Sequence, residues 1–232
     1  MTLQPESVVE GRPRSVLIAD DHPMFRLALR YALSARDGQV EIVEAASQAA
    51  LEAAVMADAF DLALLDLAMP GVNGFSSLVY LRCERPHMPV IVISSYEDPG
   101  TAHRARQLGA AAFVPKSAMV KDICHAIEVV LVGGTWFPAG KADGGGADAR
   151  VRRRLTSLTT QQLRVLLCVG EGLLNKQIAD ELHVSENTVK VHITAILKKL
   201  QCSTRTQAAL LTRSLLLDPS LAPLQIRGEG IA

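Results

Sequence analysis

The chain has 232 residues, of which 49% are hydrophobic, and its 24 Lys and Arg side chains balance 24 Asp and Glu side chains. This length allows one domain of ordinary size and a second, smaller one. No apolar run approaches the roughly 20 residues that a membrane-spanning helix needs, and residues 1–14 lack the apolar segment of a signal peptide. We therefore expect a cytoplasmic protein with no membrane as a partner.

The balanced total conceals an uneven distribution of charge along the chain. Residues 1–149 carry 12 basic and 18 acidic side chains, a net charge of −6, whereas residues 150–213 carry 11 and 4, a net charge of +7. This split predicts two domains with different partners, and it indicates a polyanion as the partner of the second. The four cysteines show no metal-ligand spacing and are typical of buried thiols in a reducing compartment.

Apolar runs alternate with amphipathic segments after residues 1–14, which we expect to be disordered. The expected strands are residues 15–19, 40–45, 61–66, 90–94 and 112–115, and the expected helices are residues 22–35, 48–57, 75–83, 99–108 and 119–131. Strands that alternate with helices predict a parallel sheet with helices on both faces. Five such units match the flavodoxin-like strand order 2-1-3-4-5.

Acidic side chains follow two of the expected strands at the point where each strand ends. Asp20 and Asp21 come directly after the first strand, and Asp66 closes the third, before a Met-Pro-Gly turn. Any one of these acids alone could be a helix N-cap or a turn residue. Together, at the carboxyl edge where α/β sheets bind ligands, they would repel one another unless a hard cation such as Mg²⁺ lay between them.

Two further strand ends supply a hydroxyl group and an amine. Ser94 ends the fourth strand, and Lys116 follows the fifth. A cation, a nucleophilic carboxylate, a hydroxyl donor and an ammonium group are what a phosphoryl group on Asp66 would need. Five of the six histidines, His22, His87, His103, His125 and His183, show no ligand spacing, so we expect surface or helix roles for them.

These strand-end motifs resemble the receiver domain of two-component response regulators. The residues that carry the resemblance are Asp20-Asp21, Leu65-Asp66-Leu67-Ala68-Met69-Pro70-Gly71, Ile93-Ser94-Ser95 and Phe113-Val114-Pro115-Lys116. The resemblance implies that Asp66 accepts phosphate from a sensor histidine kinase. It also implies that Mg²⁺ is held by Asp21, Asp66 and the Ala68 carbonyl, with Asp20 acting partly through water.

The same resemblance assigns roles to the residues around the phosphoryl group. Lys116 would pair with the phosphoryl oxygens and Ser94 would hydrogen-bond to them. Ser94 would move inward, Phe113 would follow, and the surface around the fourth and fifth helices would shift. We place this domain at residues 15–134 and a flexible linker, rich in Gly and small polar residues, at residues 135–155.

The basic part of the chain, which we place at residues 156–217 before a tail at 218–232, has the pattern of a small four-helix domain. A helix with Thr159 as its N-cap is followed by a second at 175–182, a tight turn, a third at 186–200 and a fourth at 204–217. A helix, a turn and a basic amphipathic helix form a helix-turn-helix arrangement. Val189, Ile193, Ile196 and Leu200 would form the buried stripe of the third helix.

Residues 158–208 resemble the LuxR-type DNA-binding domain of the NarL/FixJ subfamily. The resemblance includes Asn175-Lys176-Gln177-Ile178-Ala179, Ser185 to His192, and Arg205-Thr206-Gln207-Ala208. It implies that Lys190, Val191 and Thr194 face the bases of double-stranded DNA. It places five further residues near phosphates: Asn175, Lys176, Thr188, His192 and Lys198. Many relatives have a basic residue in place of Thr194, and a Glu-Arg pair in place of Gln161-Gln162.

The expected fold is therefore a flavodoxin-like (βα)5 α/β receiver domain followed by a small all-α helix-turn-helix domain. The expected function is a transcriptional regulator, not an enzyme, that forms a homodimer when phosphorylated, with RNA polymerase as a further candidate partner. Two alternatives remain open: a DNA-binding protein that is independent of phosphorylation, and a phosphoaspartyl hydrolase. The hydrolase usually has a second acid two residues after its nucleophile, where this chain has Ala68.

Overall fold

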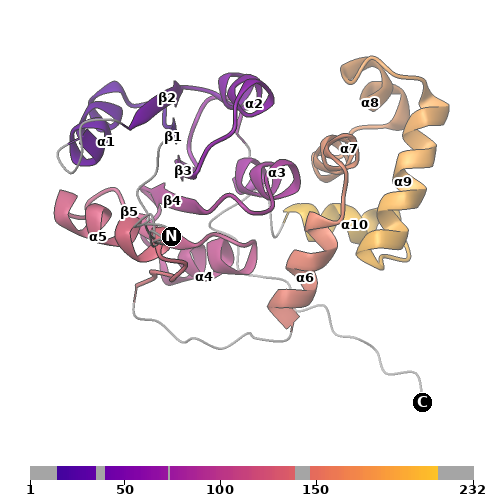
Figure 1. Cartoon of the computed structure of the whole chain (residues 1–232). Coiled ribbons are helices and arrows are strands. Elements are labelled where there is room, and N and C mark those ends of the chain that lie inside the picture. Colours follow the sequence, from indigo (N-terminus) through magenta and orange to yellow (C-terminus); the bar gives the residue numbers. More distant parts are fainter. Residues whose placement is uncertain (1–14, 35–39, 73, 139–146, 214–232) are drawn as a thin grey trace, which may run out of the picture.

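Five parallel strands form one sheet in the order β2-β1-β3-β4-β5 in the computed structural model, which describes residues 15–34, 40–72, 74–138 and 147–213 (Figure 1). The strands are β1 (Ser15–Ala19), β2 (Glu41–Ala45), β3 (Leu62–Leu65), β4 (Val90–Ser94) and β5 (Ala112–Pro115). This strand order confirms the predicted flavodoxin-like topology. The expectation of a disordered N-terminus falls on residues 1–14, which lie outside the described part of the chain.

Five helices cover the two faces of the sheet: α1 (Pro23–Ser34), α2 (Gln48–Ala57), α3 (Ser76–Glu84), α4 (Pro99–Gln107) and α5 (Val120–Leu131). Alternate strand residues enter two separate apolar clusters. Val16 and Ile18 pack in the cluster with α1 and α5, whereas Leu17 and Ala19 pack in the cluster with α2, α3 and α4. Because both faces are covered, β1, β3, β4 and β5 are apolar at nearly every position, which explains their continuous hydrophobic runs, whereas the edge strand β2 carries Glu41 and Glu44.

Four helices follow in the basic part of the chain: α7 (Thr160–Gly170), α8 (Asn175–Glu181), α9 (Glu186–Leu200) and α10 (Arg205–Thr212). Three members of the predicted stripe of α9, Val189, Ile196 and Leu200, are almost completely buried, and Ile193 is half-buried. The stripe fixes how α9 is rotated about its own axis, so the opposite side faces outward. The predicted end of the fourth helix, residues 214–217, and the tail lie outside the described residues.

The structure corrects the prediction of a flexible linker over residues 135–155. Residues 147–156 form a helix, α6 (Ala147–Thr156), and Leu155 on it is only 2% exposed. Trp136 also pairs with β5, since Phe113 N donates to Trp136 O at 2.9 Å. The composition of α6 is polar and rich in arginine, so the helix is stabilised by packing that the local sequence does not reveal. The middle of the predicted linker, residues 139–146, lies outside the described part.

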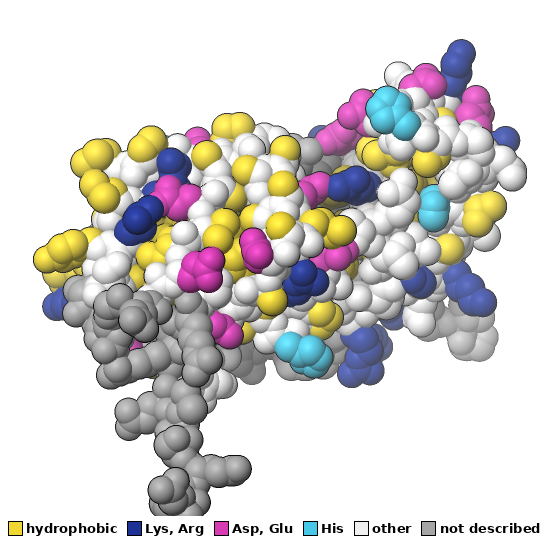
Figure 2. Space-filling view, turned by 45° about the horizontal axis from the view of Figure 1, so that its top comes forward, with side chains coloured by type: hydrophobic (Ala, Val, Ile, Leu, Met, Phe, Trp, Pro, Cys, Tyr) yellow, Lys and Arg dark blue, Asp and Glu magenta, His cyan; other side chains and the backbone are white. Residues whose placement is uncertain are grey.

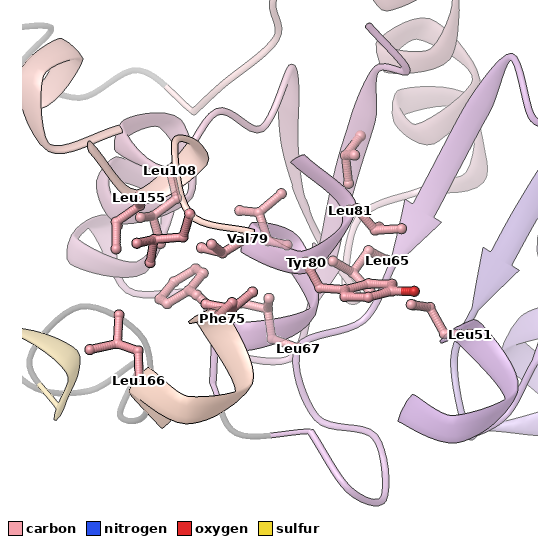
Figure 3. Packing of buried hydrophobic residues seen from close by; sticks show 14 of the residues in the cluster. Leu51, Leu65, Leu67, Phe75, Val79, Tyr80, Leu81, Leu108, Leu155 and Leu166 are labelled. Atoms are coloured by element: carbon pink, nitrogen blue, oxygen red, sulfur yellow. The ribbon is translucent and has the colours of Figure 1, made fainter. Parts of the chain in front are cut away.

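The helical part of the chain packs against the receiver part through α6 and α7. One apolar cluster runs through both parts, and in Figure 3 Leu155 lies beside Leu108, which directly follows α4, while Leu166 of α7 lies near Phe75. Polar contacts flank this cluster: Arg164 of α7 forms an ion pair with Glu52 of α2, and the Cys83 thiol donates to the Leu155 carbonyl at 3.7 Å. The two parts therefore form a continuous docked structure.

Candidate functional site

The three predicted acids meet at the carboxyl edge of the sheet. Asp20 follows β1 and Asp66 follows β3, and their backbone N–H groups continue the ladder, Asp20 to Ala45 O at 3.0 Å and Asp66 to Ala19 O at 2.8 Å. Carboxylate oxygens of Asp20, Asp21 and Asp66 and a ring nitrogen of His22 all lie within 4.8 Å of one another. Asp20 and Asp66 are 2% and 1% exposed, so their charges lie in a largely desolvated pocket.

Lys116 joins two of these acids. Its Nζ lies 2.7 Å from Asp20 Oδ2 and 2.7 Å from Asp66 Oδ2. Burial raises the pKa of the Asp66 carboxyl above its ordinary value, and the hydrogen bond from Lys116 offsets only part of this effect. Burial alone would lower the pKa of Lys116, but the hydrogen bonds to Asp20 and Asp66 outweigh it and hold this pKa above its usual range.

The pocket residues fit a divalent cation with oxygen ligands. Lys116 compensates one of three neighbouring carboxylates, which leaves an excess of negative charge beside the half-exposed Asp21. Asp21 Oδ1 is buried and accepts no hydrogen bond, although His22 Nδ1 lies 2.7 Å from it. A buried carboxylate oxygen without a donor is a ready ligand for a hard cation. Ala68 also borders the pocket, because its N–H donates to Asp66 Oδ1 at 3.1 Å.

Ser94 and Phe113 lie on the strands beside the acid cluster. The register pairs Leu65 with Val92 and Ser94 with Pro115, so Asp66 follows directly after a paired residue and Ser94 is the last paired residue of β4. Ser94 is completely buried, and its Oγ accepts a hydrogen bond from Tyr96 N at 3.1 Å. Phe113 is 1% exposed. The Lys116 N–H donates to Ser94 O at 2.8 Å, which joins the ammonium-bearing loop to the end of β4.

Three residues of α1 and the loop before it border the pocket, and the sequence interpretation did not find them. The ring of His22 lies 3.3 Å from Lys116 Nζ, and the Phe25 ring centroid lies 5.0 Å from the same ammonium. Arg26 donates to Asp20 O at 2.8 Å and pairs with Glu44. The expected surface role of His22 is therefore incomplete: the ring is 61% exposed, yet it touches the acid cluster. Its position directly after the acid pair was the available signal.

The second predicted site lies on α8, the turn after it, and α9. His183 in the turn adopts a left-handed conformation with φ of 52°, and Ser185 caps α9 by accepting from Thr188 N at 3.1 Å. Both features allow a sharp change of direction between the two helices. The Asn175 side chain is held in place, since its Oδ1 accepts from Arg205 at 2.7 Å.

The predicted DNA-contacting side chains lie on the accessible side of these helices. Lys176, Lys190, Thr194 and Lys198 are exposed, and Val191 is 61% exposed although it is apolar. Asn175, Thr188 and His192 are half-buried. In Figure 1, α9 stands at the side of the molecule away from the sheet, and in Figure 2 dark blue basic side chains are spread over this right-hand part. The docked receiver part therefore leaves this surface uncovered.

Gln162, near the start of α7, forms polar contacts with α9 and with the N-terminus of its own helix. Gln162 Oε1 accepts from Lys199 Nζ at 2.7 Å and from the Thr159 N–H at 3.1 Å. Gln162 N in turn donates to Thr159 Oγ1, which completes the capping box of α7. A charge-assisted hydrogen bond from Lys199 therefore connects α9 to the start of α7.

Comparison with known proteins agrees with this fold and identifies two protein families along the chain. Residues 16–128 match the response regulator receiver domain, and residues 156–212 match the luxR family of bacterial regulatory proteins. The chain is 37% identical over 205 residues to the glycerol metabolism activator of Pseudomonas putida, covering 84% of this chain and 93% of that protein. It is 31% identical over 203 residues to the nitrate/nitrite response regulator protein NarL of Escherichia coli K12, covering 85% and 94%.

The fold is also found among solved structures. A structure of the RcsB response regulator from Salmonella typhimurium matches with a TM-score of 0.51 and 22% identity, covering 86% of this chain and 97% of that one. A structure of two RcsB dimers bound to two parallel DNAs matches with a TM-score of 0.50 and 22% identity, covering 85% and 96%. At this identity the likeness establishes the fold.

A parallel sheet with an acidic pocket at its carboxyl edge, joined to a helix-turn-helix domain, defines a signal-receiving DNA-binding protein. The chain belongs to the two-component response regulators that combine a receiver domain with a LuxR-type DNA-binding domain, and it is a DNA-binding transcription regulator. Within the described residues, no helix is long and apolar enough to cross a membrane.

Proposed function

We propose that phosphorylation of Asp66 by a sensor histidine kinase controls DNA binding by the C-terminal helices. The observation that carries this proposal is the Lys116 ammonium, which lies 2.7 Å from both Asp20 and Asp66 at the centre of the acid cluster. An ammonium in this position is ready to pair with a new anion on Asp66.

The chemistry is a transfer of a phosphoryl group to a carboxylate. An Asp66 Oδ atom attacks phosphorus, the bond between phosphorus and the donor imidazole nitrogen breaks, and its electron pair stays on the imidazole. Lys116 then pairs with the phosphoryl oxygens, and Ser94 turns its hydroxyl hydrogen toward them. Mg²⁺ held by Asp20, Asp21, Asp66 and the Ala68 carbonyl would neutralise charge on these oxygens.

The phosphoryl group then changes the structure on the side of β4. It adds about two negative charges in a desolvated pocket, and Ser94 and Phe113 rearrange in response. α4 follows β4 and ends directly before Leu108, and Leu108 lies beside Leu155 of α6 (Figure 3). A shift of α4 thus reaches the docked helical domain and favours a homodimer on DNA. RNA polymerase is a further candidate partner of that complex.

The outward side of α8 and α9 supplies the contacts to double-stranded DNA. An α-helix about 10–12 Å wide fits the major groove, which is about 12 Å wide. Lys190, Val191 and Thr194 lie on the exposed side of α9 and would face the bases. Five residues would approach phosphates: Asn175, Lys176, Thr188, His192 and Lys198. Because Arg205 occupies the Asn175 oxygen, the amide NH₂ group stays available to donate to a phosphate.

The test is transfer from a small acyl phosphate, followed by intact-mass spectrometry of the full chain. With acetyl phosphate and Mg²⁺, the wild-type chain should gain the mass of one phosphoryl group, and Asp66→Asn should gain none. Asp58→Asn, at an exposed acid far from the pocket, is the matched control and should be phosphorylated like wild type. Equal labelling of Asp66→Asn would reject Asp66 as the acceptor.

A further inference from the structure

A ring nitrogen of His22 converges on the acid cluster. His22 Nδ1 lies 2.7 Å from Asp21 Oδ1 and 3.3 Å from Asp20 Oδ1. A ring nitrogen of His22 and one carboxylate oxygen from each of Asp20, Asp21 and Asp66 all lie within 4.8 Å of one another. His22 therefore brings a nitrogen donor to a pocket whose other candidate ligands are oxygens.

The backbone of His22 is held in place at both ends of the residue. The His22 N–H donates to Asp20 Oδ1 at 2.7 Å. The His22 carbonyl accepts from Phe25 N and from Arg26 N, both at 3.1 Å, at the start of α1. With the backbone fixed in this way, the position of the ring depends only on its two side-chain torsions. The turn between β1 and α1 therefore presents the ring to the acids.

The contacts of Nδ1 indicate that this atom carries a lone pair. Lys116 Nζ lies 3.3 Å from Nδ1, and an ammonium group can only donate, so Nδ1 accepts in this contact. Asp21 Oδ1 has no hydrogen-bond partner, although Nδ1 is 2.7 Å away. Two electron-rich atoms at this separation, with no hydrogen between them, repel each other. A cation bound to both atoms would replace this repulsion by attraction.

The spacing of these atoms fits one coordination sphere. Adjacent ligands that lie about 2.1 Å from a six-coordinate ion are about 3.0 Å apart. The separations of Nδ1 from Asp21 Oδ1 and Asp20 Oδ1, 2.7 and 3.3 Å, lie on either side of this value. We propose that His22 supplies a nitrogen ligand to the divalent cation of this pocket and shifts its preference toward transition-metal ions such as Mn²⁺ and Co²⁺. The proposal rests on the cation site of the proposed function, and it adds a ligand and a class of ion.

An imidazole ligand distinguishes between metal ions more strongly than a carboxylate does. Mg²⁺ prefers oxygen ligands and retains several water molecules, whereas imidazole suits transition-metal ions, for which affinity rises from Mn²⁺ to Co²⁺. Loss of the nitrogen ligand should therefore weaken the binding of Co²⁺ most and of Mg²⁺ least. By contrast, a histidine that only donated a hydrogen bond to Asp21 would compete with every ion for this carboxylate. Its removal would strengthen the binding of all ions alike.

Calorimetric titration of the full chain with Mg²⁺ and with Co²⁺ measures this difference. His22→Leu removes the nitrogen ligand, and His125→Gln is the matched control, because His125 is similarly exposed, at 62%, but lies outside the acid cluster. In His22→Leu we expect the dissociation constant to rise by about tenfold or more for Co²⁺ and by less than about twofold for Mg²⁺. His125→Gln should bind both ions like the wild type. Equal changes for the two ions in His22→Leu, or tighter binding of both, would overturn the proposal.

Pulsed electron paramagnetic resonance of bound Mn²⁺ detects the nitrogen ligand directly. A nitrogen nucleus bonded to Mn²⁺ couples to the electron spin of the ion, whereas an oxygen ligand gives no such coupling. The nitrogen coupling should be present in the wild type and in His125→Gln. It should be absent in His22→Leu and in His22→Asn, whose amide can offer an oxygen ligand in place of the nitrogen. Absence of the coupling from the wild type, or its retention in both His22 variants, would contradict the proposal.

Asp21→Asn separates failure of this proposal from failure of the cation site itself. If the pocket binds a cation, Asp21→Asn should weaken the binding of both Mg²⁺ and Co²⁺. Equal affinities of Asp21→Asn and the wild type for both ions would contradict the cation site, and with it this proposal. Weaker binding in Asp21→Asn, together with an unchanged ratio of the Co²⁺ and Mg²⁺ affinities in His22→Leu, would contradict this proposal alone. Because the ratio compares two ions in one variant, a change in the folded fraction does not affect it.

Discussion

The carboxylates of the acid cluster lie close together, and their mutual repulsion lowers the free energy of unfolding. Asp66 is 1% exposed and shares the Lys116 ammonium with Asp20. We expect Asp66→Asn to raise the free energy of unfolding on the order of 1 kcal/mol without Mg²⁺, because it removes one charge from the repelling set. Thermal unfolding measures this, with Asp58→Asn as the control. Lower stability of Asp66→Asn would contradict the prediction.

The raised pKa of Asp66 also determines whether the free energy of unfolding rises or falls with pH. Burial raises the pKa of this carboxyl above its value in the unfolded chain, so the folded chain retains the proton to higher pH. Between the two pKa values, the contribution of Asp66 to the free energy of unfolding falls as the pH rises, and it stays low above them. Asp66→Asn should remove this part of the pH profile. Added Mg²⁺ should stabilise the wild type at neutral pH and stabilise Asp66→Asn much less.

Two thiols offer a third prediction about single residues. Burial raises the pKa of Cys83 and of Cys168 to about 11. At pH 8 only about one such thiol in a thousand is a reactive thiolate. Alkylation of both by iodoacetamide, followed by peptide mass spectrometry, should be about a hundredfold slower in the folded chain than in urea. Rapid alkylation of folded Cys168 at pH 8 would contradict its burial in α7.

At the level of elements, the start of α7 allows a gain in stability. Gln162 accepts hydrogen bonds from Lys199 Nζ and from the N-terminus of its own helix. Gln162→Glu places a carboxylate at both contacts, and we expect it to raise the free energy of unfolding by about 0.5–1 kcal/mol. Gln161→Glu places a carboxylate at the same helix N-terminus but away from Lys199, so it should raise the free energy of unfolding by less. Denaturant unfolding at low salt compares the two, and equal gains would exclude the Lys199 contact as the cause.

Sequence patterns predicted most helices and strands of this chain, because their buried apolar side chains recur at regular spacings along the sequence. The runs Val90–Ser94 and Ala112–Pro115 are strands with the predicted bounds, since both faces of the sheet are covered. α6 was missed because its sequence is rich in arginine, and because the buried side chain Leu155 packs in an apolar cluster made by residues far from it in the chain. His22 was missed because its contact with Lys116 depends on residues far apart in the chain.

At the scale of the whole molecule, Leu155 joins the two domains. Leu155→Ala removes buried methyl groups between α6 and α4 and should cost about 2–4 kcal/mol, which loosens the docking. Because the Cys83 thiol contacts the Leu155 carbonyl, Cys83 alkylation should accelerate by about tenfold, while Cys168 alkylation should not. Leu33→Ala is the matched control, since Leu33 is buried in α1 on the other face of the sheet. Equal acceleration in both variants would indicate global destabilisation in place of undocking.

The central claim is that the pocket around Asp66 controls the surface of α9. The most direct test of this claim uses a DNA duplex that the full chain has selected from a randomised pool. The dissociation constant of the full chain for this duplex is measured at fixed salt, with and without acetyl phosphate and Mg²⁺. The account predicts that acyl phosphate tightens binding by about tenfold or more in the wild type and leaves Asp66→Asn unchanged. Equal affinity of the phosphorylated and unphosphorylated wild-type chain would contradict it.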